Sequence, residues 1–282
     1  MLNHLSELKK ASLFYFIVMA LSLALVIFFR LVAPASDLVV LANMLTPALA
    51  TVIMLYVLTS DGYKRKGPFS LGLSRSGWQS WGPALLLPLV VLTITYGLAW
   101  LSRAAGFLAP TGDGWFPNLI IFILSNLLII IPLVTAEEIG FRGYLLPRLR
   151  EMGPAKAVVI SGFLHGAWHL PLIFLTSFYL TEGNRLLTIP LFLLLLTTSG
   201  MMSGVLRLTT DSIWPSVVLH ATFNTFLGVF ATLTAASSPL SIYIIGESGV
   251  LTLAVTAGVA VWFLQSWLNK RPVNLVKPAL AE

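Results

Sequence analysis

The sequence contains no cysteine and few charged side chains. Without cysteine, the chain can have no disulfide bonds, thiolate zinc sites, cysteine nucleophile or iron–sulfur ligation. Charged residues make up 10% of the sequence, well under the roughly 25% that is typical of a soluble domain. Hydrophobic residues make up 57%, and the mean hydropathy is +0.90. This composition excludes an ordinary soluble globule.

The apolar residues are concentrated in runs close to twenty residues long, the length of a helix that crosses a bilayer. We expect about eight membrane spans, at residues 13–32, 38–58, 83–101, 119–136, 157–176, 186–206, 213–235 and 250–268. The sequence therefore predicts an all-α fold, a polytopic membrane helix bundle of about eight transmembrane helices. We expect a single integral membrane domain over residues 1–282.

The basic residues are distributed unevenly between the two sides of this arrangement. With a cytoplasmic N-terminus, 13 of the 17 basic residues fall on the cytoplasmic side: Lys9, Lys10, Lys64, Arg65, Lys66, Arg75, Arg148, Arg150, Lys156, Arg207, Lys270, Arg271 and Lys277. Three fall outside (Arg30, Arg103 and Arg185), and Arg142 lies within the membrane. The positive-inside rule then predicts a multi-pass protein of the cell membrane with both termini cytoplasmic. Since the basic residues form short clusters between apolar runs, we expect the lipid bilayer as a partner and no nucleic acid.

Two local features predict further structure. The connection at 61–81 carries Lys64, Arg65 and Lys66 and then Trp78 and Trp81, a mixture that favours an interfacial helix. On the sixth expected span, glycines at 200 and 204 form a small-residue face. Such a face allows close helix packing.

Very few ionisable residues fall inside the expected spans. An intramembrane charge costs on the order of 3 kcal/mol or more and therefore indicates function. Measured along their helices from the cytoplasmic connections, Glu137, His169 and His220 lie at similar depths of about 13–20 Å. The motif core thus extends over residues 137–224, and its polar residues are Glu137, Glu138, Arg142, His165, His169, His220 and Asn224.

The spacing of these residues predicts how they face one another. Glu138 and Arg142 are four residues apart and can form a charge pair, whereas Glu137 points about 100° away around the helix. The pairs His165/His169 and His220/Asn224 have the same spacing, so each presents two polar groups to one side. We expect Glu137, His169 and His220 to act in a site and Glu138 and Arg142 to orient them. His165 belongs either to the site or to the packing around it.

A carboxylate and histidines without cysteine suggest that water is activated. Glu137 can take a proton from water, and His220 with Asn224 can donate to an oxyanion. A zinc site of two histidines and Glu137 competes with this interpretation, although the 165–169 segment lacks the glutamate of H-E-x-x-H. The same residues are also compatible with a proton-coupled transporter, an immunity or scaffold protein without catalysis, and a purely structural polar network.

Three motifs in this region resemble those of a known family. Residues 137–142 read EEIGFR and match E-E-x-x-x-R, and residues 143–146, GYLL, are also similar. Residues 165–171 read HGAWHLP and resemble F-x-x-x-H followed by Leu-Pro. Residues 220–224 read HATFN and match H-x-x-x-N. In order and spacing these motifs resemble the CPBP family (CAAX protease and bacteriocin-processing, or Abi, proteins) of intramembrane glutamic endopeptidases.

This resemblance implies a metal-independent peptidase that needs no cofactor and acts on a peptide or protein substrate, in some members one with a lipidated tail. It implies that Glu137 activates water, that His169 positions or shares its proton, and that His220 and Asn224 form the oxyanion hole. Glu138 and Arg142 would support them. The sequence departs from the family at His165, which occupies the position of the motif phenylalanine.

Overall fold

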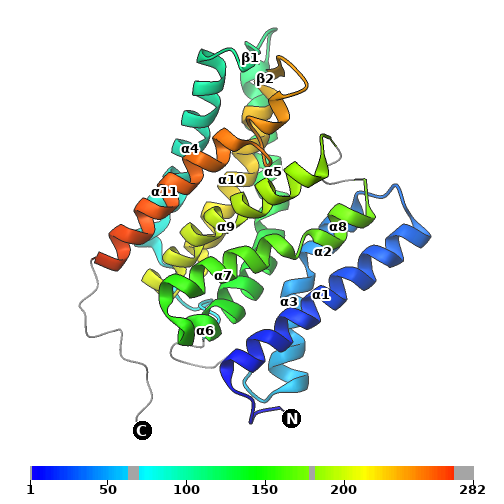
Figure 1. The fold of residues 1–282 in the computed structure, drawn as a ribbon, viewed down its shortest axis with the longest axis vertical. Helices are drawn as coiled ribbons and strands as arrows, with labels where there is room; N and C mark the ends of the chain where they lie inside the picture. Colours follow the sequence, from blue (N-terminus) through cyan, green and yellow to red (C-terminus); the bar gives the residue numbers. More distant parts are fainter. Residues whose placement is uncertain (1, 63–69, 178–181, 270–282) are drawn as a thin grey trace.

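The computed structural model describes residues 2–62, 70–177 and 182–269 as a bundle of long helices (Figure 1). Its first half contains α1 (Glu7–Val32), α2 (Leu38–Met44), α3 (Thr46–Val52), the π-helix η1 (Ile53–Leu58), the short helix η3 (Trp78–Ser80), α4 (Trp81–Leu101), β1 (Ala105–Phe107) and α5 (Trp115–Glu138). The π-helix η4 (Ile139–Leu145), α6 (Leu146–Leu149), η5 (Arg150–Met152), α7 (Pro154–Ala167) and α8 (Leu170–Leu175) follow. The last elements are α9 (Arg185–Thr210), α10 (Trp214–Thr232), β2 (Thr234–Ala236), η6 (Ser241–Tyr243) and α11 (Val250–Asn269).

The membrane character that the sequence predicts is confirmed by helix length and composition. Within the described residues, seven helical stretches are long and apolar enough to cross a bilayer: Glu7–Val32, Leu38–Leu58, Trp78–Leu101, Trp115–Met152, Pro154–Leu175, Arg185–Thr210 and Val250–Asn269. The seventh expected span, 213–235, is not among them. It corresponds to α10, which has 19 residues and packs against α4, α5 and α9. This helix carries the polar residues His220 and Asn224, which lower its hydropathy.

Three expected spans differ from the helices observed. The second has the expected bounds, Leu38–Leu58, but is divided into α2, α3 and η1, with Pro47 in the first turn of α3. The fourth does not end at residue 136, because its helix continues through η4 and α6 to Met152. The fifth is interrupted after α7, and α8 begins with Pro171 in its first turn. The changes to the fourth and fifth spans lie next to predicted polar residues.

The prediction of an interfacial helix in the connection at 61–81 was wrong for those residues of the connection that the structure describes. Residues 63–69 lie outside the described residues, and 70–77 form no helix. Trp78 begins η3 and Trp81 begins α4, so the two tryptophans belong to the start of a membrane span.

The helical fold also includes a two-stranded antiparallel sheet that the hydropathy pattern did not predict. Gly106 of β1 pairs with Ala235 of β2. Figure 1 places this pair of strands at the end of the molecule opposite the N-terminus. The sheet joins the chain after α4 to the chain after α10, two helices that also pack against each other.

The close packing predicted for the sixth span is confirmed, since α7 and α9 cross where glycines face each other. A Cβ atom on Gly200 would lie 2.6 Å from Cα of Gly162, and one on Gly204 would lie 2.8 Å from Cγ1 of Val158. Contacts this short require backbones that approach without side chains between them. The crossing holds α7, which carries His165, against α9.

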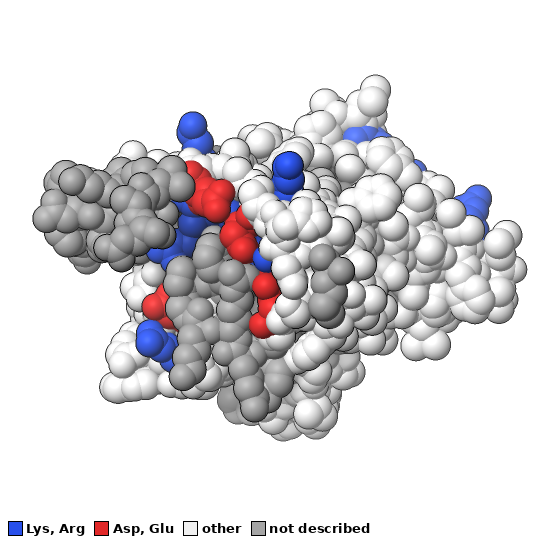
Figure 2. All heavy atoms as spheres, turned by 90° about the horizontal axis from the view of Figure 1, so that it is seen from below, with Lys and Arg blue, Asp and Glu red and all other residues white. Residues whose placement is uncertain are grey.

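On the face seen in Figure 2, the acidic side chains and several basic ones lie close together, while most of the visible surface is uncharged. Among the charged groups, Asp61 accepts Lys10 Nζ at 3.3 Å and Arg148 Nη2 at 3.2 Å, which links α1 and α6 to the chain after η1. Leu124 and Leu128 on α5 and Phe28 on α1 are among the many large apolar side chains that lie exposed along the helices. Such outward apolar faces are typical of helices in contact with lipid.

Candidate active site

The site is built around the junction between α5 and η4. Glu137 and Glu138 are the last residues of α5, and Arg142 lies in the π-helix that follows. A π-helix widens the turn locally and is frequent at functional sites. Gly140 lets this widened turn pack against α3, because a Cβ atom there would lie 2.5 Å from Cβ of Pro47.

Glu138 and Arg142 form the charge pair that their spacing predicts, with Arg142 Nη1 3.1 Å from Glu138 Oε1. Both side chains are buried, with exposed fractions of 0% and 1%. The same Glu138 oxygen lies 3.0 Å from Nδ1 of His220 on α10. An ionised carboxylate only accepts hydrogen bonds, so His220 Nδ1 carries a proton and donates it. This fixes the orientation of the His220 ring.

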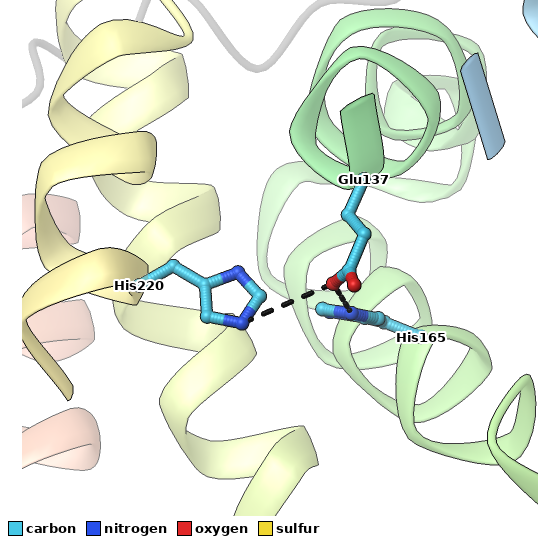
Figure 3. Close-up of side chains that lie close together, drawn as sticks. All are labelled: Glu137, His165 and His220. Carbon is cyan, nitrogen blue, oxygen red and sulfur yellow. Dashed lines mark hydrogen bonds and ion pairs between the residues drawn. The ribbon is translucent and has the colours of Figure 1, made fainter. Parts of the chain in front are cut away.

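Glu137 points toward two imidazoles (Figure 3). Its Oε2 lies 3.0 Å from Nε2 of His165 and 3.9 Å from Nε2 of His220. The first distance is a hydrogen bond, whereas the second is too long for one and leaves His220 Nε2 available to another molecule. Glu137 is 2% exposed, so its carboxylate is buried inside the bundle, where it borders a cavity.

His165 is hydrogen-bonded through both ring nitrogens. Its Nδ1 lies 2.8 Å from Arg142 Nη1, and its Nε2 faces Glu137. The ring also stacks on Phe141, with centroids 4.4 Å apart. Arginine has no acceptor, so His165 Nδ1 must accept and the ring proton must lie on Nε2. His165 is therefore a neutral imidazole that donates to Glu137.

His169 lies beside this group at the start of α8. Its Nδ1 is 3.2 Å from the His165 carbonyl oxygen, which accepts a hydrogen bond from it. Its ring centroid is 5.6 Å from that of His165 and 5.4 Å from that of Phe192. Among the described residues, the imidazole nitrogens within 4 Å of the Glu137 carboxylate belong to His165 and His220.

All seven predicted residues except Glu138 line one cavity. Its volume is about 190 Å³, room for several water molecules at about 30 Å³ each. Asn224 lines it one helical turn beyond His220, and apolar walls are contributed by Leu172, Leu195 and Phe223 among others. The combination of a few polar groups and apolar walls is typical of a site for a ligand with an apolar part.

Glu247, from the connection between β2 and α11, lines the same cavity and was not predicted. The sequence assigned it to a connection between spans, and no periodic pattern relates it to the motifs. Its place in the cavity comes from the packing of α11 against α9 and α4.

Glu137, His165 and His220 also form a cluster that could hold a metal ion. One ligand atom from each of the three lies within 4.8 Å of those of the other two. Carboxylate oxygen and imidazole nitrogen are both ligands for zinc. The geometry at Glu137 is therefore compatible in outline with two chemistries, water activation by the carboxylate and zinc binding.

Comparison with known proteins finds a similarity to one family over part of the chain. Residues 115–226 match the family described as "Type II CAAX prenyl endopeptidase Rce1-like". A second similarity is to "CAAX prenyl protease 2" of Methanococcus maripaludis, at 27% identity over 180 residues. The chain is therefore similar to CAAX-type prenyl endopeptidases over residues 115–226. This match includes every residue from Glu137 to Asn224, so the three motifs lie within the matched region.

The similarity to the Methanococcus protein covers only part of each chain. The alignment covers 62% of this chain and 60% of the Methanococcus protein, so the chain spans about three fifths of the length of the curated relative it matches.

Proposed function

We propose that the protein is an intramembrane endopeptidase that hydrolyses a peptide bond with water activated by Glu137. The observation that supports this most is the geometry of the Glu137 carboxylate. It is buried, lines a cavity, and accepts a hydrogen bond from His165, whereas Arg142 pairs with the neighbouring Glu138. A carboxylate without its own cationic partner in an apolar surrounding remains able to accept a proton.

In the proposed reaction Glu137 takes a proton from a water molecule while the water oxygen bonds to the carbonyl carbon of the substrate. The carbonyl π electrons move to its oxygen, and the resulting oxyanion accepts hydrogen bonds from Asn224 and His220. The carbon–nitrogen bond then breaks, and the proton held by Glu137 passes to the leaving amine. His220 Nε2 donates only when both ring nitrogens are protonated. The ring is then positively charged, and its charge would lie between Glu137 and Glu138.

The remaining predicted residues have supporting roles in this proposal. Glu138 and Arg142 orient His220 and His165, and His169 lines the cavity near Glu137, where it can contact water or substrate. The apolar cavity walls favour a peptide or protein substrate with an apolar or lipidated segment next to the cleaved bond. We also propose that the protein lies in the cell membrane with both termini cytoplasmic.

A zinc-dependent peptidase is the second candidate, because Glu137, His165 and His220 are close enough to share an ion. The surroundings of His165 argue against it. A zinc-bound histidine donates its other ring N–H to a carboxylate, carbonyl or water. Here the other nitrogen faces Arg142, which can only donate, so zinc on His165 Nε2 would place two donors 2.8 Å apart. We therefore favour the metal-independent reaction.

The deciding experiment replaces Glu137 with glutamine. Glu137→Gln keeps the size of the side chain but removes the proton acceptor, so we expect cleavage of a membrane-inserted test peptide to be lost while the protein stays folded and still binds the peptide. Val159→Leu, on the exposed face of α7, is the control and should cleave normally. Normal cleavage by Glu137→Gln would contradict the proposed function.

A further inference from the structure

His165 has a position in the structure that the family motif, with phenylalanine there, does not anticipate. The residue is 4% exposed, and its side chain lies on α7, between Arg142 of η4 and Glu137 of α5. The three side chains form a continuous chain of hydrogen bonds in which Arg142 Nη1 donates to Nδ1 and Nε2 donates to Glu137 Oε2. A phenylalanine at 165 would preserve the stacking on Phe141 but neither hydrogen bond.

We propose that His165 is a positioning residue for the proposed peptidase reaction, held by Arg142 in its Nε2–H form so that it orients the carboxylate of Glu137. This inference rests on the proposed function for its effect on rate, but the hydrogen-bonded form of His165 can be measured without any substrate.

The charge on Arg142 determines the form of the ring. If His165 took up a second proton, its Nδ1–H would point at the N–H of a guanidinium 2.8 Å away. Two donors and two positive charges at that distance repel, so the ring stays neutral. The hydrogen bond to Glu137 therefore comes from a neutral group, which fixes the carboxylate without neutralising its negative charge.

His165, more than His169, is therefore the imidazole that acts directly on Glu137 in this chain. His169 donates from Nδ1 to the His165 carbonyl oxygen, a contact that ties its ring to the end of α7. The imidazoles whose Nε2 atoms approach Glu137 are those of His165 and His220. Of these two, His165 is within hydrogen-bonding distance.

The experiment combines kinetics with ¹⁵N NMR of histidine-labelled protein in detergent or nanodiscs. The chain has only four histidines, and the His165 signals are assigned by their absence in His165→Gln. We expect an unprotonated Nδ1 and a protonated Nε2 at neutral pH. A protonated Nδ1 would overturn the proposal, whatever the enzyme's activity.

For the kinetics, His165→Phe removes both hydrogen bonds and restores the side chain of the family motif. We expect kcat to fall about 100-fold, with KM changed by less than about threefold, because orientation of the base affects the chemical step more than binding. His165→Gln retains a donor and an acceptor and should recover most of kcat. Phe163→Leu, exposed on the same helix, is the control and should leave kcat and the NMR signals unchanged.

The outcomes separate the two hypotheses. Full kcat in a folded His165→Phe variant would overturn the positioning role. If Nε2 of His165 is protonated but the Glu137→Gln variant cleaves at the wild-type rate, the proposed function is contradicted. The hydrogen-bonded form of His165 would still be established.

Discussion

Glu138 and His220 lie 82 positions apart in the chain, and their side chains meet at 3.0 Å, with Nδ1 of His220 donating to Oε1 of Glu138. Because Arg142 donates to the same oxygen at 3.1 Å, a single carboxylate organises residues from η4 and α10. The two neighbouring glutamates thus have different surroundings. Glu137 faces the cavity, whereas Glu138 is occupied with Arg142 and His220.

This difference predicts unequal effects of the two glutamine substitutions on stability. Glu138→Gln leaves Arg142 as a buried charge without its partner, which typically costs about 3–5 kcal/mol. We expect a clear fall in the unfolding temperature in detergent, lower expression, and reduced cleavage. Glu137→Gln should unfold close to the wild-type temperature. Near-normal cleavage by Glu137→Gln, together with a Glu138→Gln variant that is as stable as the wild type but inactive, would mean that the two carboxylates exchange roles.

Asn224 tests the oxyanion site. Its side chain lines the cavity one helical turn beyond His220. Asn224→Ala removes one proposed donor, and losing such a donor typically lowers kcat by about 10²–10³-fold. We expect slow but measurable cleavage, with KM nearly unchanged, in steady-state assays. Complete retention of kcat would remove Asn224 from the reaction.

The role of metal can be tested on the purified protein. If Glu137 activates water directly, cleavage should survive strong chelators, and elemental analysis should find no stoichiometric zinc. About one zinc per chain, lost together with activity, would instead make Glu137, His165 and His220 ligands.

At the crossing of α7 and α9, we expect position 200 to tolerate no residue larger than glycine. A Cβ atom on Gly200 would lie 2.6 Å from Gly162 Cα and 2.8 Å from Arg142 Nη2. Gly200→Ala should therefore destabilise the protein by about 1–3 kcal/mol and displace Arg142, which lowers activity. Gly258→Ala on α11 is the matched control, since a Cβ atom there meets nothing within 4 Å. Equal melting temperatures for the two variants would show that the helices can separate at little cost.

The orientation can be measured by labelling, because the chain has no cysteine of its own. Ser74 and Thr111 are exposed; Ser74 lies in the connection before α4, and Thr111 lies in the connection between β1 and α5. With both termini cytoplasmic, Thr111→Cys should react with an impermeant maleimide on intact cells, and Ser74→Cys only after permeabilisation. The reverse pattern would invert the topology derived from the 13 basic residues.

The membrane helices and the identity of the polar residues could be predicted from the sequence, since both follow from local properties. Apolar length predicts a span, and the cost of a buried charge singles out Glu137, Arg142 and His220. The spacing of Glu138 and Arg142 also predicted their pairing, because neighbours on one helix are fixed by its geometry. Local properties did not predict the extension of α5 through η4, the pairing of β1 with β2, or the break before α8. Each of these depends on what the segment packs against.

Hydropathy and helical period act over a few turns, so the sequence is enough to predict a bundle of apolar helices with polar side chains at one depth that are costly to bury in a membrane. Which polar atoms meet depends on the tertiary structure. His165 and His169 are four residues apart, so helical spacing alone does not show which of them contacts Glu137. The position of Arg142, set by the packing of α7, α9 and η4, directs His165 Nε2 to Glu137. Glu247 likewise enters the cavity through the packing of α11. Hydrogen bonds depend on distances of a few tenths of an ångström between distant segments, and those distances are fixed by packing.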